Sequence, residues 1–231
     1  MKLHLFVFLL TLSCYQAFSQ NDFRRFALGA GAGITSNRSD LSISNPEQMI
    51  YGSVDFYLTR YIHGGTELQL GKLSGREERS SQRYFENDYK QALVYAKLHL
   101  GQFLDVDNRR YRQGGGTTAR NILYGFYLGS GGGVLSSTQV NIRRIYSDDI
   151  DPYQAYLYRG KDSNKELFIP AIAGLDLPVG KQARFIVGAE YRLNFLLGDL
   201  MDGYLITGSG NDMFSSFSLG VKYAFGRLQL Y

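Results

Sequence analysis

Beyond the first twenty residues the chain has two histidines, His63 and His99. A histidine can serve as a general base or a metal ligand only when suitable partner residues lie close to it. His99 has no obvious serine on its own segment to activate as a nucleophile, and no regular metal-ligand spacing includes either histidine. We therefore interpret both as residues of the interior or rim of the fold, and we predict no catalytic residue and no metal site.

Two glycine runs and one acidic run also suggest chemistry. The glycine-rich residues 29–33 and 129–133 lack the Gly-Lys-Ser/Thr ending and the strand-to-helix context of a phosphate-binding loop. Asp148, Asp149 and Asp151, with Asp162 nearby, do not follow the twelve-residue spacing of a calcium loop. We predict close strand packing for the glycines, a solvated loop for the acids, and no cofactor.

The segment around these acids, residues 136–165, combines tyrosines with arginines. Both residue types are enriched at binding hot spots, whereas tyrosine also belongs to the aromatic belts of membrane proteins. Both interpretations stay open, and contact with another envelope protein or a surface glycan is one hypothesis. Its candidate residues are Arg143, Arg144, Tyr146, Tyr153, Tyr156 and Tyr158.

The N-terminus has the pattern of an export signal. Lys2 supplies a positive start, residues 3–12 form a short apolar run, and residues 17–19 provide small residues before a cleavage site. The run is shorter than the ~20 apolar residues that a membrane-spanning helix needs. We predict a signal peptide at residues 1–19, cleaved after Ser19, and a single mature domain at residues 20–231.

The only cysteine, Cys14, lies inside this predicted signal peptide. A disulfide framework, a cysteine metal site and a thiol nucleophile are therefore excluded from the mature chain. A competing interpretation makes Cys14 the acceptor of a lipoprotein anchor. Thr11 disfavours it, because an apolar residue normally stands three positions before such a cysteine.

After the signal, apolar residues alternate with small or polar ones, and no segment has the length and period of a confident helix. A period of two is the signature of a strand with one apolar face. About 9–11 residues of tilted strand are enough to cross a membrane. The sequence predicts an all-β fold, a closed, eight-stranded, antiparallel, up-and-down transmembrane β-barrel. The predicted strands include residues 26–34, 50–59, 66–71, 94–100, 122–129, 167–177, 185–195 and 213–225.

The predicted connections alternate between short and long. Residues 60–65 and 178–181 form short turns, and most other connections are longer polar loops, as in outer-membrane barrels. The connection at residues 101–120 departs from this pattern, because it is long and rich in arginine and glycine where a short turn is expected. Its role stays open.

The face opposite the apolar residues carries charges of both signs. Alternation alone would also suit a lipocalin-like barrel or an immunoglobulin-like sandwich, in which this face would be solvated. In a narrow eight-stranded membrane barrel the same face points inward, where only paired charges are tolerated. We predict a charge network in the lumen, formed by Asp55, Glu67, Lys97, Glu190, Arg192 and Lys222.

The last predicted strand ends in the spacing Ser218-x-Gly220-x-x-Tyr223-x-Phe225, which resembles the signal that the barrel assembly machinery recognises. With residues 57–62 and 211–226, it makes the chain similar to the outer-membrane β-barrel domain family of small OmpA/OmpX-like barrels. The resemblance covers essentially the whole mature chain. It implies a location in the outer membrane of a Gram-negative bacterium, with outer-membrane lipid and the assembly machinery as partners.

The net charge of +4 is too small to indicate binding to nucleic acid. Our first functional hypothesis is a non-enzymatic barrel with a closed polar lumen, which has a structural role or interacts through its extracellular loops or as an accessory subunit of an envelope complex. One alternative is an envelope lipid-modifying enzyme, such as a lipid A hydrolase or acyltransferase. Another is a soluble lipocalin-like carrier.

Overall fold

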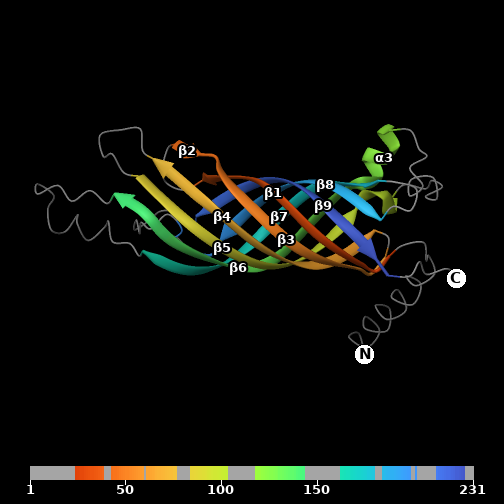
Figure 1. The fold of residues 1–231 in the computed structure, drawn as a ribbon, viewed down its shortest axis with the longest axis horizontal. Coiled ribbons are helices and arrows are strands. Elements are labelled where there is room, and N and C mark those ends of the chain that lie inside the picture. The colour runs from red at the N-terminus through yellow and green to blue at the C-terminus, as the bar shows by residue number, and fades with distance from the viewer. Residues whose placement is uncertain are drawn as a thin grey trace, which may run out of the picture.

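A computed structural model describes residues 24–38, 43–59, 61–76, 84–103, 118–143, 162–179, 184–198, 201 and 212–226. Most of these residues belong to eight long strands that form the wall of a barrel (Figure 1). One short strand and two short helices accompany them. The elements are β1 (Phe26–Arg38), β2 (Ile43–Asn45), β3 (Glu47–Tyr57), β4 (Ile62–Arg76), β5 (Tyr84–His99), η2 (Leu100–Phe103), α3 (Thr118–Gly125), β6 (Phe126–Arg143), β7 (Ser163–Val179), β8 (Phe185–Leu196) and β9 (Met213–Phe225).

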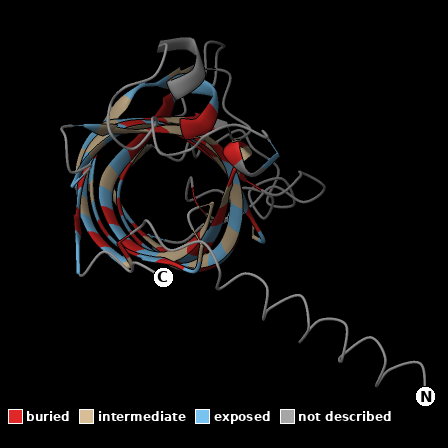
Figure 2. Cartoon of the chain, turned by 90° about the vertical axis from the view of Figure 1, so that its right-hand side faces the viewer, coloured by how far each residue is buried: buried red, intermediate tan, exposed pale blue. Residues whose placement is uncertain are grey.

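The wall closes on itself. Around the barrel the strands run in the order β4, β3, β1, β9, β8, β7, β6 and β5, and β5 pairs back with β4. Every pairing is antiparallel, including the pairing of β1 with the final strand β9. Viewed along the barrel, the strands form a ring (Figure 2). The predicted closed, eight-stranded, up-and-down barrel is confirmed, and β2 is an addition that pairs with the far end of β4.

The outward positions of the strands expose large apolar side chains. On β4, Leu68 and Leu70 are 69% and 49% exposed, whereas Glu67 and Gln69 beside them are 4% and 1% exposed. A continuous apolar surface of this extent is stable against lipid rather than water, so the soluble lipocalin-like carrier is not supported. The band includes Leu28, Ile34, Ile50, Val54, Leu68, Leu70, Val94, Leu128, Leu167, Ile169, Val187, Phe217, Leu219 and Val221.

Two features at one end of the barrel differ from the predicted strands. Leu100, predicted to end a strand, lies in η2, and Ile122 and Tyr124, predicted to begin one, lie in the helix α3. The prediction that Leu100 ends one strand and that Ile122 and Tyr124 begin the next was wrong. Eight residues of alternating apolarity do not distinguish a short helix from a strand, because two helical turns are too few to define a period. Residues 104–117 of the long connection lie outside the described residues.

At the other end the strands are longer than predicted. β5 already begins at Tyr84, β6 continues to Arg143, and β7 begins at Ser163, so residues 136–143 and 163–165 of the predicted loop are strand. Backbone hydrogen bonding does not require an apolar face, so the ladder can continue past the point where the apolar alternation stops. No described helix is long and apolar enough to cross a membrane.

The described termini lie at the same end of the barrel as α3 (Figure 1). Here Arg24 Nη1 donates a hydrogen bond of 2.5 Å to the carbonyl oxygen of Gly226. We call this the terminal end of the barrel and the opposite one the loop end. The even number of wall strands places both described termini together, as expected for an up-and-down barrel.

Candidate functional site

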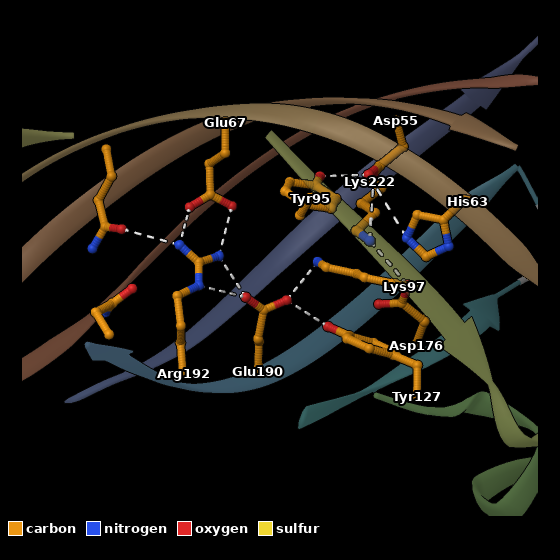
Figure 3. Close-up of polar contacts among 12 residues, drawn as sticks. Asp55, His63, Glu67, Tyr95, Lys97, Tyr127, Asp176, Glu190, Arg192 and Lys222 are labelled. Atoms are coloured by element: carbon orange, nitrogen blue, oxygen red, sulfur yellow. Dashed lines mark hydrogen bonds and ion pairs between the residues drawn. The ribbon is translucent and has the colours of Figure 1, made fainter. Parts of the chain in front are cut away.

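The inward positions of β4, β5 and β8 assemble a chain of four charged side chains (Figure 3). Arg192 donates from Nη1 to Glu67 Oε1 at 2.7 Å and from Nη2 to Glu67 Oε2 at 3.1 Å. Its Nη2 also donates to Glu190 Oε1 at 2.5 Å, and Lys97 Nζ donates to Glu190 Oε2 at 2.6 Å. All four side chains are buried. Two acids face two bases, so this group is electrically balanced.

A second group of charges lies nearer the terminal end. Lys222 Nζ donates to Asp176 Oδ2 at 2.9 Å and lies 3.4 Å from Asp55 Oδ2. Tyr95 Oη donates a 2.5 Å hydrogen bond to Asp55 Oδ1. All four residues are inaccessible or nearly so: Asp55, Asp176, Lys222 and Tyr95 are at most 6% exposed. Two carboxylates here face a single ammonium group.

Tyrosine rings connect the two groups. Tyr127 Oη donates to Glu190 Oε2 at 2.7 Å. The ammonium group of Lys97 lies 4.2 Å from the centre of the Tyr95 ring and 5.0 Å from that of Tyr127. A cation above an aromatic face gains electrostatic stabilisation, and more so in a desolvated site. The rings therefore support the ionic side chains and fill the space between them.

Glycines on adjacent strands make the room for these rings. A Cβ added at Gly174 of β7 would lie 2.5 Å from Cζ of Tyr127, and one added at Gly65 of β4 would lie 2.7 Å from Cζ of Tyr95. Both distances are shorter than any real contact. A side chain at either glycine would therefore displace a tyrosine that hydrogen-bonds a buried carboxylate.

The six charged residues predicted for the lumen are all buried. Ion pairs join four of them in one group and the other two with Asp176 in a second group. Removing an ion from water costs several kcal/mol, which only close partners offset. Asp176 is missing from the predicted set, because the prediction followed only the outward residues of its strand. Its position between outward Leu175 and Leu177 was a usable signal.

An apolar cluster, which the sequence prediction missed entirely, extends from Tyr95 and Tyr127 of the ionic groups toward the loop end of the interior. Met201 lies inside it, is 0% exposed, and accepts hydrogen bonds at its carbonyl oxygen from Asn87 Nδ2 at 2.6 Å and Gln139 Nε2 at 3.1 Å. The Met201 N–H donates to Asp212 Oδ2 at 2.9 Å. The cluster comprises Leu73, Phe85, Tyr89, Leu93, Tyr95, Tyr127, Leu135, Phe168, Ile172, Leu196, Met201 and Phe214.

Both histidines lie inside the barrel at its terminal end. His63 is 0% exposed and stacks on Tyr57, with 4.7 Å between ring centres. His99 is 8% exposed, with its ring centre 5.2 Å from that of His63 and 5.2 Å from that of Tyr127. His63 Nε2 lies 3.8 Å from Asp55 Oδ1. The two histidines thus border the group that contains Asp55 and Asp176.

The residues of the closing-strand signature lie on both faces of β9. Ser218 is buried and Gly220 faces the interior, whereas Tyr223 and Phe225 are 39% and 37% exposed on the outside. The ring of Phe225 stacks on that of Phe26 across the β1–β9 seam, with 5.8 Å between centres. The two exposed aromatics stand at the terminal rim of the apolar band.

Most of the candidate contact residues of the loops lie outside the described residues. Arg143 is the last residue of β6, so its predicted place in a loop was wrong: the β5–β6 ladder reaches it through its pairing with Tyr84. The residues outside the described ranges are Arg144, Tyr146, Tyr153, Tyr156 and Tyr158.

The closed wall, the exposed apolar band and the enclosed charges together define a small transmembrane β-barrel. Antiparallel barrels with an even number of strands and an apolar outer band are the barrels of outer membranes. The chain is therefore an outer-membrane β-barrel protein, and its architecture agrees with the predicted resemblance to small OmpA/OmpX-like barrels.

No protein-family model and no curated protein matches the sequence. Among solved structures, the chain is similar to Neisserial surface protein A, with 13% identity, a TM-score of 0.47, and 87% of this chain and 97% of that one covered. It is similar to Ail of Yersinia pestis in complex with the heparin analogue sucrose octasulfate, with 10% identity, a TM-score of 0.45 and coverage of 88% and 99%. It is also similar to the outer membrane protein OprG of Pseudomonas aeruginosa, with 10% identity, a TM-score of 0.40, and 90% of this chain and 100% of that one covered.

Proposed function

We propose that this protein is a non-conducting anchor in the outer membrane of a Gram-negative bacterium, with a structural or interaction role carried by its extracellular loops. In this proposal residues 1–19 are removed as a signal peptide and residues 20–231 form the barrel. The observation that carries the proposal is the filled interior. Along the barrel axis, a layer of paired ions is followed by a layer of packed apolar side chains.

The ionic layer closes the lumen because its charges are already engaged. Arg192 is held by Glu67 and Glu190 at once, and Lys222 by Asp176 and Asp55. A hydrated ion that entered would have to separate these pairs in a low-dielectric interior, where leaving a charge unpaired costs about 3–5 kcal/mol. Eight strands leave an interior only wide enough for side chains.

The apolar layer closes the loop end independently. Phe168 and Phe214 are 1% and 0% exposed, and Met201 lies in the cluster with them. A constriction lined by such residues excludes water and with it hydrated ions. The ionic layer and the apolar layer therefore block the path through the barrel at two successive levels.

Planar-bilayer recording tests the closed lumen. We expect no discrete current steps from the purified barrel, whereas a porin added to the same bilayer produces them and shows that the bilayer reports conduction. Phe214→Ala, which weakens only the apolar layer, should also stay silent because the ionic layer remains. Reproducible, steady single-channel steps from the wild-type barrel would contradict the proposal.

The proposed partners follow from the two ends of the protein. The barrel assembly machinery would recognise Ser218, Gly220, Tyr223 and Phe225, two of which are exposed aromatics beside lipid. Another envelope protein or a surface glycan would contact the loop end. Cross-linking in intact cells, followed by purification from detergent-solubilised outer membrane, tests both. Recovery of the barrel alone, without any cross-linked envelope component, would argue for a purely structural role.

We propose no catalytic role. His63 and His99 pack against aromatic rings inside the barrel rather than on its lipid-facing surface, where a lipid substrate would be reached. A lipid-modifying enzyme needs a nucleophile and base together at the membrane interface. Mass spectrometry of lipid A from strains with and without the gene should give the same spectrum. If lipid A from the strain without the gene differed in mass, and returning the gene abolished the difference, the result would support the enzyme hypothesis.

A further inference from the structure

A group of three side chains at the terminal end of the interior is not explained by a closed lumen. His63 of β4, His99 of β5 and Asp176 of β7 are all buried, and their potential ligand atoms lie within 4.8 Å of one another. We propose that these residues form a binding site for a divalent transition-metal ion of the Zn²⁺ type. The site goes beyond the proposed anchor function and does not depend on it.

The donor set suits such an ion. Zn²⁺ is bound by imidazole nitrogens and carboxylate oxygens at about 2.0–2.2 Å, usually in tetrahedral geometry with water in any remaining position. Ligand atoms in that geometry lie about 3.3–3.6 Å apart. The ligand atoms of His63, His99 and Asp176, which lie within 4.8 Å of one another, would have to approach by up to about 1.5 Å to share one ion. Mg²⁺ and Ca²⁺ prefer an all-oxygen shell, which two histidines do not offer.

The histidine nitrogens are available for a metal. Neither Nδ1 nor Nε2 of His63 makes a hydrogen bond among the described residues, and the same holds for Nε2 of His99. A buried polar atom without a partner costs about 1–3 kcal/mol, and such atoms are few in native proteins. Other buried side chains, such as Gln91, also hold polar atoms without a hydrogen-bond partner among the described residues. It is the pairing of two adjacent imidazoles with the carboxylate of Asp176 that points to a metal ion between them.

His99 is also oriented as a metal ligand would be. It hydrogen-bonds the backbone of Gly125, the last residue of α3. Metal-binding histidines commonly donate one ring N–H to a backbone carbonyl, which fixes the ring and directs the other nitrogen at the ion. In this proposal α3 places the backbone of Gly125 beside the site, where it holds the His99 ring.

The site lies among ions of both signs. The group of Asp55, Asp176 and Lys222 contains two carboxylates and one ammonium, so the nearest ions include one more negative charge than positive. The neighbouring ammonium of Lys97 is engaged by Glu190 at 2.6 Å. When Asp176 binds the metal, Lys222 keeps Asp55 at 3.4 Å as its counter-ion.

Metal analysis of the full-length barrel tests the site. The protein is exported, purified from outer membranes without a histidine tag, stripped with a chelator, refolded from urea with Zn²⁺ and freed of unbound metal. Mass spectrometry of the metal should find about one Zn²⁺ per chain. His63→Gln and His99→Gln should each lower the affinity more than tenfold. Glu166→Gln, which changes a buried carboxylate at the loop end, serves as the matched control and should bind normally.

Co²⁺ provides a second readout on the wild-type protein alone. Loading with Co²⁺ should give the visible d–d absorption of a low-coordinate site with nitrogen and oxygen ligands, so the test does not depend on how well the variants fold. Folded wild-type barrel with no Zn²⁺ above the buffer blank and no Co²⁺ band would overturn the proposal. Metal binding that is unchanged in both histidine variants would overturn it as well, because the metal would then lie elsewhere.

Discussion

Arg192 is the residue on which the balanced ionic group depends. It contacts two buried carboxylates, Glu67 and Glu190, through four hydrogen bonds of 2.5–3.2 Å. Its planar guanidinium can serve both acids at once, which the point charge of a lysine cannot do. Without it, Glu190 would keep Lys97 as its partner, whereas the negative charge of Glu67 would lose its guanidinium partner in an interior from which water is excluded.

Replacing Arg192 by methionine therefore removes a charge whose partners cannot reach solvent. We expect Arg192→Met to lower the free energy of unfolding by about 3–5 kcal/mol, as for other broken buried ion pairs. Urea unfolding in lipid vesicles, followed by far-ultraviolet circular dichroism, measures the change. Glu67→Gln in the same chain should restore part of the loss. The exposed Arg76→Met should cost no more than about 0.5 kcal/mol, and an equal cost for both arginines would contradict the account.

Lys72 shows the opposite, solvent-exposed type of ion pair. It lies on the outside of β4, one outward position beyond Leu70 toward the loop end, 3.3 Å from Glu86 and 3.6 Å from Asp88. The hydrogen bond from Lys72 to Glu86 and the charge of Asp88 raise the pKa of Lys72 above its ordinary value of 10.5. A raised pKa in the folded state stabilises the fold below the unfolded pKa, and this contribution is lost as the pH rises through the folded pKa.

The difference in unfolding midpoint between wild type and Lys72→Met should therefore be constant from neutral pH to about 10.5 and decline above it. The effect should be small, because exposed pairs are screened by water and salt. Urea titrations at a series of alkaline pH values measure it. In a Glu86→Gln background the difference should shrink at every pH. A difference that grows above pH 10.5 would show that another group is responsible.

At the scale of the elements, the barrel depends on glycines that lie opposite large rings. Gly174 of β7 faces Tyr127, Gly71 of β4 faces Tyr89, and both rings are buried. The missing side chains leave room for the rings beside the neighbouring strand. A glycine on the outside of the wall does not make room for a ring. A Cβ at Gly132 of β6 would meet nothing within 4 Å.

Replacement by alanine should change the free energy of unfolding differently at these two kinds of glycine. Gly174→Ala should lower the free energy of unfolding by about 1–3 kcal/mol, because its Cβ would lie 2.5 Å from the Tyr127 ring and 2.8 Å from the Ala189 carbonyl oxygen. Gly132→Ala should be neutral or slightly stabilising, since alanine restricts the unfolded chain. Urea unfolding of both variants in vesicles gives the comparison. An equal loss of unfolding free energy in the two variants would contradict this account, because it would show that the glycines contribute strand flexibility and not room for the rings.

The sequence predicts the wall of the barrel well because lipid outside and a narrow interior impose one alternation on every strand. It does not predict where the strands end. β6 reaches Arg143 and β5 begins at Tyr84 through backbone pairing alone, to which side-chain polarity contributes little. The helix α3 was missed because two turns contain too few residues to reveal a helical period.

The site is predictable to the extent that it follows the same alternation. Glu67, Arg192 and Lys222 alternate with apolar residues, which predicts an interior position for each, and all three are buried. The pairing partners are not predictable, since Arg192 and Glu67 are 125 positions apart and meet only across the closed barrel. The apolar cluster was missed because an inward phenylalanine such as Phe168 looks like any other apolar residue between Leu167 and Ile169.

At the scale of the whole molecule, the protein is inverted relative to a soluble barrel. Apolar side chains cover the outside of the wall, and the inside holds ions in one layer and apolar side chains in the other. In lipid the hydrophobic effect does not hold the wall together, and the closed ladder satisfies every strand edge instead. The filled interior then makes the barrel a rigid support for whatever its loops contact.

Fluorescence quenching by lipids tests this orientation most directly, because the chain contains no tryptophan. Single tryptophans are introduced at one outward and one inward position of β7 and of β9: outward Leu167 with inward Phe168, and outward Phe217 with inward Phe214. In vesicles of lipids brominated on their acyl chains, Leu167→Trp and Phe217→Trp should be strongly quenched. Phe168→Trp and Phe214→Trp should keep most of their emission. Strong quenching of the inward pair, with emission retained by the outward pair, would contradict the account.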